Sequence, residues 1–330
     1  MLAIDTTPLR RRRRLPTLLI VALVTAAVGA TSTIVATRHA VDAVRRVPGV
    51  AEVLSPSDPN VENFLLVGSD SRANSDPNSP DFGGIGTEAD VQGSRSDTIM
   101  ILRRDKHGGA TALLSIPRDL WVEGRRRINS AYVDGPTTLV AVVQQELGLP
   151  IHHYVEVDFS GFKRVVDAVG GVTVCFYFPT RDLNTGLNII DPGCVVLDGV
   201  QGLAYARSRY YEEFRDGAWQ TDPTSDLGRT LRQRAFVNLA VQAALREVKL
   251  NPFRAGEMLR AISAALSVDD RLDPIAAGTS LREAVGGGIT SYTLPVVGKT
   301  IDDKAVLVLG EGAQVVLAYF RGAADAPVAG

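Results

Sequence analysis

The feature that most constrains this chain is a long uncharged segment that directly follows a cluster of positive charge. Arg10 to Arg14 is a run of five arginines, and Leu15 to Thr37 follows with 23 residues and no charged side chain. As a helix at about 1.5 Å per residue, that segment reaches about 34 Å, which is enough to cross a bilayer. Arginines before an apolar span keep the N-terminus in the cytoplasm. We therefore expect a cytoplasmic arm over 1–14 and one transmembrane helix over 15–37.

A cleaved signal peptide is the alternative explanation for this segment. Its apolar region would have about 7 to 15 residues and would end at a cleavage site with small residues. The observed segment is longer, so the pattern favours an uncleaved anchor in the cell membrane. Everything after Arg38 is then expected outside the membrane, on the extracytoplasmic side.

The charge of the exported part excludes one class of partner. Beyond Thr37 the chain carries 36 acidic and 30 basic residues, although the whole chain has a formal charge of only −2. A general nucleic-acid binder would present a basic surface, so we expect no nucleic acid as a partner.

Cys175 and Cys194 are the two cysteines of the chain, and both lie in the exported part. An oxidising compartment and 18 intervening residues favour a disulfide between them. Two unpaired buried thiols are the alternative.

The order of strand and helix patterns predicts a layered domain of α/β or α+β class over 61–330, after a partly helical connector over 38–60. We expect a polar loop around Asp216 to Asp226, and a second one between Asp70 and Asp97. The expected strands cover 63–70, 97–105, 109–119, 152–159 and 172–178, and the expected helices cover 135–149, 160–171, 199–209 and 227–248.

Two familiar kinds of active site are absent from the sequence. There is no G-x-S-x-G motif, and none of the four histidines stands in a recognisable arrangement with a nucleophile. The segment Val297 to Thr300, VGKT, ends like a phosphate-binding loop, but Thr293 stands where that loop needs its first glycine. Neither a serine hydrolase nor a nucleotide-binding loop is predicted.

Arginines instead recur at the ends of the expected elements. Because like charges repel, such a group predicts an anionic ligand, and guanidinium groups match phosphate oxygens in a bidentate manner. The start of a helix adds free N–H groups and a favourable dipole. The candidate phosphate-binding residues are Arg95, Arg118, Arg207, Arg209, Arg229 and Gln233. For each arginine alone, a solvated surface position is the simpler explanation.

Two carboxylates could complete such a site. Asp70 ends the first expected strand and Asp97 begins the next, so they meet at one edge if these strands are antiparallel neighbours. Two carboxylates together with phosphate oxygens suit Mg²⁺. The alternative is that these two carboxylates cap a turn and form a salt bridge with Arg72 or Arg95.

Taken in order, these segments resemble the LytR-CpsA-Psr family of cell-wall enzymes over about residues 60 to 245. The similar blocks are NFLLVGSDSR, GSRSDTIMIL, LLSIPRDLWV, RINSAY, HHYVEVDFSGF, GVQGLAYARSR and DLGRTLRQR. The resemblance implies a three-layer α/β/α sandwich with a central mixed sheet and an apolar groove for a prenyl chain. It also implies a phosphotransferase that moves a glycopolymer from a polyprenyl-pyrophosphate carrier onto peptidoglycan through a phosphodiester.

By the same resemblance, Asp70 and Asp97 would hold Mg²⁺ or Mn²⁺. The arginines and Gln233 would bind the pyrophosphate, with Arg118 and Asp97 as catalytic residues. We also expect Asp119 to hold Arg118 in place. The remaining alternatives are a non-catalytic carrier of the polyprenyl lipid and a lipid pyrophosphatase without transfer.

Overall fold

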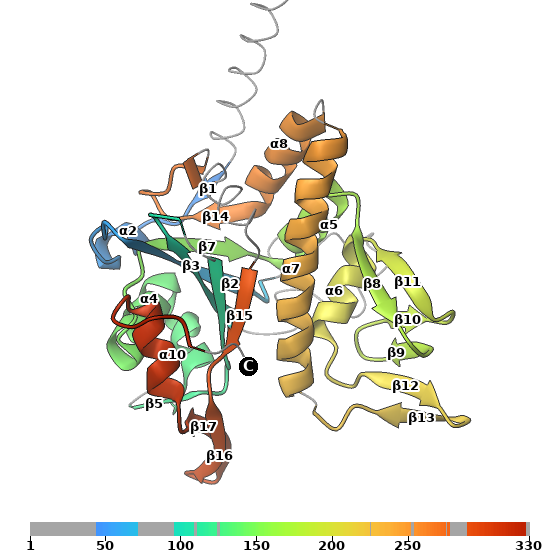
Figure 1. Cartoon of the computed structure of the whole chain (residues 1–330). Coiled ribbons are helices and arrows are strands. Elements are labelled where there is room, and N and C mark those ends of the chain that lie inside the picture. The colour runs from blue at the N-terminus through green and yellow to red at the C-terminus, as the bar shows by residue number, and fades with distance from the viewer. Residues whose placement is uncertain are drawn as a thin grey trace, which may run out of the picture.

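The computed structural model describes residues 44–71, 96–108, 111–123, 126–224, 226–251, 254–274, 276–277 and 289–327 (Figure 1). The expected arm and transmembrane helix, residues 1–37, lie outside these ranges. Within the described part of the chain, no helix has the length and apolar character needed to cross a membrane.

A seven-stranded mixed sheet forms the centre of the domain, as the alternating pattern predicted. Its parallel pairs are β1 with β14, β7 with β2 and β4 with β15, and the other neighbouring pairs are antiparallel. In spatial order the strands are β1 (Arg45–Arg46), β14 (Leu266–Val268), β7 (His153–Val157), β2 (Val61–Ser69), β3 (Ser96–Asp105), β4 (Thr111–Ile116) and β15 (Ile289–Thr293).

Helices cover both faces of this sheet because its strands alternate between two apolar faces. In β2, Leu65 and Val67 belong to a core with the helices of one face, whereas Phe64 and Leu66 belong to a core on the opposite face. The first face carries α2 (Val50–Val53), η1 (Ile128–Asp134), α4 (Pro136–Leu147) and α10 (Ala313–Phe320). The second carries α5 (Phe159–Ala168), α6 (Gly199–Arg207), α7 (Asp226–Leu250) and α8 (Ala255–Ala265) (Figure 1).

The described part of the expected connector packs onto the domain. The strand β1 pairs with β14 at the edge of the sheet, and α2 adds the fully buried Val50 to the core. Leu54, immediately after α2, is 5% exposed. Residues 44–54 thus bury apolar side chains against the sheet.

Small sheets lie outside the central one. A four-stranded sheet contains β10 (Leu187–Ile189), β9 (Thr180–Asp182), β12 (Glu212–Arg215) and β13 (Ala218–Thr221), in that order. Two-stranded sheets pair β8 (Val172–Phe176) with β11 (Gly193–Leu197), β16 (Val296–Ile301) with β17 (Lys304–Leu309), and β5 (Trp121–Val122) with β6 (Arg126–Arg127).

The expected polar loop around Asp216 is wrong, because this segment forms the β12–β13 hairpin. Phe214 pairs with Trp219 and Arg215 with Ala218, which leaves Asp216 and Gly217 as a two-residue turn. Both turn residues have positive φ, at 52° and 80°. An Asp-Gly pair is a preferred sequence for such a turn, so the hairpin had a recognisable sequence signature.

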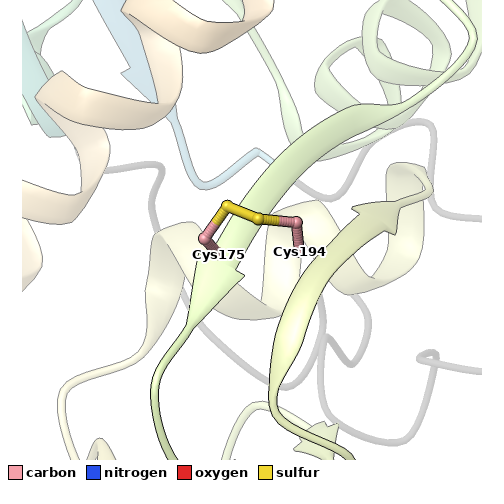
Figure 2. The surroundings of a disulfide bond; sticks show 2 residues. All are labelled: Cys175 and Cys194. Atoms are coloured by element: carbon pink, nitrogen blue, oxygen red, sulfur yellow. A yellow bond between two sulfur atoms is a disulfide. The ribbon is translucent and has the colours of Figure 1, made fainter.

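The predicted disulfide between Cys175 and Cys194 is confirmed. The two cysteines are directly opposite each other on β8 and β11 (Figure 2). The bond therefore joins β8 to β11, the strand that directly precedes α6.

Candidate functional site

Several strand ends meet at one edge of the central sheet. The strands β2 and β7 are parallel and end together, with Gly68 opposite Val157. The strand β3 starts at the same edge, where Ser69 pairs with Ser96. The strand β4 ends there as well, since Ile116 is opposite Ile99.

The strands that carry Asp70 and Asp97 are neighbours and antiparallel, as the metal hypothesis required. A shift in register between Gly68 and Ser69 accommodates Asp97 as an extra residue in β3. Such a bulge redirects a side chain at the end of a strand. The backbone thus places the two aspartates on adjacent strand ends, whereas the side chain of Asp97 and the whole of Arg95 lie outside the described part of the structure.

Next to this edge, a cavity of about 240 Å³ lies between the sheet and helices α5, α6 and α7. Its walls are mainly aliphatic and aromatic. The apolar lining residues are Leu66, Val67, Met100, Val155, Val157, Phe159, Phe162, Leu203, Ala206, Phe236, Val237 and Leu266. The polar lining residues are Ser69, Thr98, Asp158, Arg207, Arg229 and Gln233.

The first turns of α7 present two of these polar side chains to the cavity. Arg229 and Gln233 are four residues apart and therefore share one face of the helix. Arg229 is 2% exposed and Gln233 is 9% exposed. The Nε2 atom of Gln233 donates a hydrogen bond to the carbonyl of Ala206 at 3.0 Å, which links α7 to the end of α6.

Arg207 reaches the same cavity from the last turn of α6. Its guanidinium carbon lies 4.6 Å from the centroid of the Phe159 ring, a cation–π contact that fixes the direction of the side chain. Two guanidinium groups and an amide thus gather at the polar part of an otherwise apolar cavity. Guanidinium groups match the oxygens of anions such as phosphate, so Arg207, Arg229 and Gln233 are suited to an anionic group.

Arg118 lies outside the cavity lining but at the same edge of the sheet. It follows Pro117 directly after β4, and its carbonyl accepts a hydrogen bond from the backbone N–H of Asn129 at 3.2 Å. The carboxylate of Asp119 lies 3.8 Å from Nε of Arg118 and 3.1 Å from a guanidinium nitrogen of Arg127. Asp119 thus pairs with Arg118 and, more closely, with the neighbouring Arg127, in line with the expectation that it holds Arg118 or its neighbours.

Arg209 follows α6, and the buried Asp182 fixes the turn that carries it. One carboxylate oxygen of Asp182 accepts from the hydroxyl of Ser208 at 2.7 Å and from the backbone N–H groups of Arg209 and Tyr210 at 3.1 and 3.0 Å. Arg209 does not line the cavity. The structure therefore brings Arg207, Arg229 and Gln233 together, and it leaves Arg209 on the segment just beyond them.

Arg232, in the DLGRTLRQR block, was not among the predicted phosphate-binding residues but lies in this region. Its guanidinium group donates to Asp222 at 2.9 Å and to the carbonyl of Ser208 at 2.7 Å, and it stacks 4.4 Å above the ring of Tyr211. Burial opposes ionisation of Asp222, but hydrogen bonds from Thr224 and Arg232 lower its pKa. Arg232 thus joins the start of α7 to the end of α6 and to the segments that flank the β12–β13 hairpin.

A half-buried carboxylate network also lies near this edge and was not predicted. Glu156 of β7 accepts hydrogen bonds from the phenol groups of Tyr132 and Tyr154 at 2.6 and 2.7 Å. Burial, and then the charge of Glu156, raises the pKa of Tyr132. The RINSAY segment therefore contributes a neutral tyrosine that supports the sheet from its other face.

No group of three or more His, Cys, Asp or Glu side chains within the described ranges could hold a metal ion. The fold and the cavity together define an α/β protein whose candidate site suits an apolar ligand with an anionic end. The model of the LytR_cpsA_psr family matches residues 24–317, so the chain belongs to that family.

Curated relatives carry names from cell-wall biosynthesis. The chain is 36% identical over 240 residues to the probable cell wall biosynthesis protein LcpB of Corynebacterium glutamicum, an alignment that covers 71% of this chain and 54% of LcpB. It is 31% identical to the polyisoprenyl-teichoic acid–peptidoglycan teichoic acid transferase TagU of Oceanobacillus iheyensis, over 65% of this chain and 66% of TagU. The chain spans about half the length of the first of these relatives.

Solved structures share the fold. A LytR-Csp2A-Psr enzyme from Actinomyces oris superposes with a TM-score of 0.64 and 25% identity, covering 84% of this chain and 95% of that enzyme. A structure described as TagT bound to LI-WTA superposes with a TM-score of 0.60 at 20% identity, covering 85% of this chain and 98% of TagT.

Proposed function

We propose that this protein is a phosphotransferase that moves a glycopolymer from a polyprenyl-pyrophosphate carrier onto peptidoglycan. The observation that carries the proposal is the apolar cavity lined at its polar part by Arg207, Arg229 and Gln233. Such a cavity suits a prenyl chain joined to a pyrophosphate. The names of curated relatives, among them a teichoic acid transferase that uses a polyisoprenyl-linked polymer, support the same class of reaction.

The reaction needs charge stabilisation more than covalent participation of the protein. The hydroxyl oxygen of an acceptor sugar forms a bond to the phosphorus that carries the glycopolymer. The bond from that phosphorus to the bridging oxygen breaks, and polyprenyl monophosphate leaves. The hydroxyl proton passes to a carboxylate at the sheet edge, for which Asp97 is our first candidate.

The arginines have separate roles in this scheme. Arg207 and Arg229 would bind the pyrophosphate oxygens at the cavity, with Gln233 as an uncharged donor beside them. Arg118, held by Asp119, would stabilise charge that develops on the leaving phosphate from the sheet edge. Arg95 and Arg209 would complete the binding of the head group.

Asp70 and Asp97 would hold a divalent cation at the sheet edge. Asp70 directly follows β2, and Asp97 is the second residue of the neighbouring β3. Two carboxylates suit Mg²⁺ or Mn²⁺ when water and phosphate oxygens supply the remaining ligands. When bound, such an ion neutralises charge on the transferring phosphate.

Residues 15–37 would anchor the domain in the cell membrane, with the N-terminus in the cytoplasm and the catalytic domain outside. This location would give the site access to lipid-linked donors and to peptidoglycan. The enzyme would be a single-pass membrane protein of cell-wall biogenesis.

The test uses the full-length protein with a polyprenyl-pyrophosphate-linked saccharide, a peptidoglycan fragment and Mg²⁺. Release of polyprenyl monophosphate coupled to labelling of the acceptor is expected, with loss of both in EDTA and in Arg118→Ala. Release without labelling of the acceptor would indicate a lipid pyrophosphatase. Tight binding of the lipid without release, even with acceptor present, would indicate a non-catalytic carrier.

A further inference from the structure

A second pocket, of about 330 Å³, lies beside the β12–β13 hairpin. Its lining is mainly polar, unlike that of the apolar cavity between the sheet and helices α5, α6 and α7, which we call the lipid cavity below. Its polar side chains come from both strands and from the segments that flank them. Tyr211, Glu213 and Arg215 contribute from one side of the hairpin, and Gln220 and Asp222 contribute from the other. We name this group of five residues the hairpin pocket.

The alternation of the hairpin directs these residues to one face. Glu213 is paired with Gln220 in the strand register, and Tyr211 and Asp222 continue the same alternation. The backbone N–H of Asp222 donates to the carbonyl of Tyr211 at 2.7 Å, which extends the hairpin by one further contact. The hairpin pocket is therefore a continuous polar strip along one face.

The opposite face of the hairpin holds this strip in place. Phe214 and Trp219 pack edge to face with centroids 5.4 Å apart, and the guanidinium of Arg181 lies 4.0 Å above the Trp219 ring. Arg181 also donates to Glu212 at 2.7 Å. Since these contacts tie β12 and β13 to β9, the hairpin pocket is organised before any ligand binds.

Arg232 connects the hairpin pocket with the lipid cavity. Its ion pair with Asp222 and its stacking on Tyr211 involve two residues of the hairpin pocket. Arg232 lies three positions after Arg229 on α7, so the two side chains are neighbours on the helix surface. The hairpin pocket therefore borders the proposed pyrophosphate site within about one helical turn.

Each carboxylate of the hairpin pocket is paired with an arginine, one inside the pocket and one on α7. Glu213 forms an ion pair with Arg215, and Asp222 forms one with Arg232. The paired carboxylates can still accept hydrogen bonds, the amide of Gln220 can both donate and accept, and Tyr211 presents an aromatic ring. This composition suits the hydroxyl and amide groups of an uncharged sugar unit better than a polyanion.

We propose that the hairpin pocket binds a sugar unit of the acceptor glycan strand, an inference that rests on the phosphotransfer proposed above. In phosphoryl transfer, the attacking and leaving oxygens lie roughly in line on opposite sides of the phosphorus. The lipid phosphate leaves on the side of the apolar cavity, so the acceptor needs a separate polar surface. The hairpin pocket is such a surface, and it directs the acceptor hydroxyl toward the phosphate bound near Arg229.

The test compares Gln220→Ala and Glu213→Gln with Asn188→Ala, which removes an exposed amide from β10 of the same small sheet. The acceptor, used with full-length protein, is a soluble tetramer of alternating N-acetylmuramic acid and N-acetylglucosamine, of which N-acetylglucosamine is the uncharged unit expected in the pocket. Loss of one or two hydrogen bonds should raise the KM for the tetramer about tenfold in the two pocket variants. The KM of the two pocket variants for the lipid-linked donor should equal that of the parent protein. Asn188→Ala should have the KM values of the parent protein for both substrates.

A second measurement follows binding of the tetramer without any donor, by its effect on tryptophan fluorescence or NMR signals. The parent protein should bind, and Gln220→Ala should bind about tenfold more weakly. Unchanged tetramer affinity and KM in both pocket variants would overturn the proposal. A rise in the KM for the donor alone would assign the hairpin pocket to the donor sugar and likewise overturn it.

The experiments also distinguish a wrong acceptor site from a wrong proposed function. If the parent protein neither releases polyprenyl monophosphate nor labels the acceptor, the phosphotransfer is refuted. Binding of the tetramer that depends on Gln220 would then still identify a glycan site, whereas active transfer with unaltered pocket variants would refute only the acceptor site.

Discussion

At the scale of single residues, the candidate site depends on polar side chains that the fold holds in fixed positions. Arg229 is buried and lines the apolar cavity, and Gln233 on the same helix face is held by the carbonyl of Ala206. A lysine at this position would not bind a phosphate group in the same way. The planar guanidinium group can bind two phosphate oxygens, whereas an ammonium group acts as a point charge.

Arg229→Lys should therefore lower kcat/KM for the lipid-linked donor by about 10- to 100-fold, since a charge-assisted hydrogen bond is worth about 1.5–3 kcal/mol. Steady-state kinetics measure the effect. Arg254→Ala, which removes an arginine with a side chain that is 62% exposed, serves as the control and should leave kcat/KM unchanged. Equal kinetics for Arg229→Lys and the parent would remove Arg229 from the site.

His153 provides a residue-scale prediction about pH, remote from the carboxyl ends of the strands. Its two ring nitrogens each lie 3.4 Å from a carboxylate oxygen, one of Glu62 and the other of Asp269. Burial alone would lower the pKa of His153, but hydrogen bonds with Asp269 and Glu62 raise it to about 9. The protonated ring is therefore bound more tightly in the folded state than in the unfolded chain.

The stabilisation from His153 should be complete below pH 6.5, near the ordinary pKa of histidine, and should disappear as the pH rises through about 9. We expect the free energy of unfolding to fall by on the order of 2 kcal/mol over that interval. Urea denaturation at pH 6 and pH 9.5 measures the change. His153→Gln should lose most of this pH dependence, and an identical decline in that variant would contradict the assignment.

At the scale of elements, close contact between α6 and α7 shapes the cavity. A Cβ atom added to Gly202 would lie 2.9 Å from Cζ of Phe236, a fully buried ring that lines the cavity. Phe236 also stacks on Phe162 at 5.5 Å. The absence of a side chain at Gly202 thus lets α7 approach α6 and keeps the Phe236 ring at the cavity wall.

Gly202→Ala should lower the free energy of unfolding by about 1 kcal/mol, because the added methyl group displaces a packed ring. Gly256→Ala in α8 is the matched control, since a Cβ there meets no atom within 4 Å. That variant should be unchanged or up to about 1 kcal/mol more stable, from helix propensity. Thermal and urea denaturation distinguish the two results, and equal effects at both glycines would contradict this account of the packing.

The β8–β11 disulfide is the second prediction at the scale of elements. It closes a loop of 18 residues and joins the strands that lead into α6. Replacing both cysteines with alanine should lower the free energy of unfolding by about 3 kcal/mol. The same loss should appear in the parent protein under reducing conditions, and the absence of either loss would show that this bond does not stabilise the domain.

At the scale of the whole molecule, the cavity lies between two layers, so a ligand in it should stabilise the entire domain. Polyprenyl pyrophosphate at 100 times its Kd should add about 2.7 kcal/mol to the free energy of unfolding. A polyprenol without phosphate, at the same free concentration, should stabilise the domain much less because it offers nothing to Arg207 and Arg229. Equal stabilisation by both lipids would contradict an anion site in the cavity.

The sequence by itself determined the elements with strong local patterns. The strands β2, β3 and β4 have long apolar runs or alternation, and α7 is a long segment rich in strong helix formers such as Ala, Leu, Arg and Gln, so each was predictable without its partners. The spacing of Arg229 and Gln233 on one helix face also followed from local sequence. The disulfide between Cys175 and Cys194 was expected because they are the two cysteines of the chain and both lie in the part expected outside the membrane. The meeting of Asp70 and Asp97 required one further assumption, the antiparallel pairing of β2 and β3, which the structure confirms.

Only the tertiary structure decided which of the predicted residues share a cavity. Arg207 and Gln233 come from different helices, and their convergence depends on the packing of α6 against α7 rather than on any local pattern. The two-residue strand β1 forms only because it pairs with β14. A segment that short has no sequence pattern that would predict a strand. The role of Arg232 likewise depends on Asp222 and Tyr211, which reach it from a separate hairpin. Local sequence sets the conformation of each segment, but the free energy that places one segment against another comes from burial and charge pairing between residues distant in the chain.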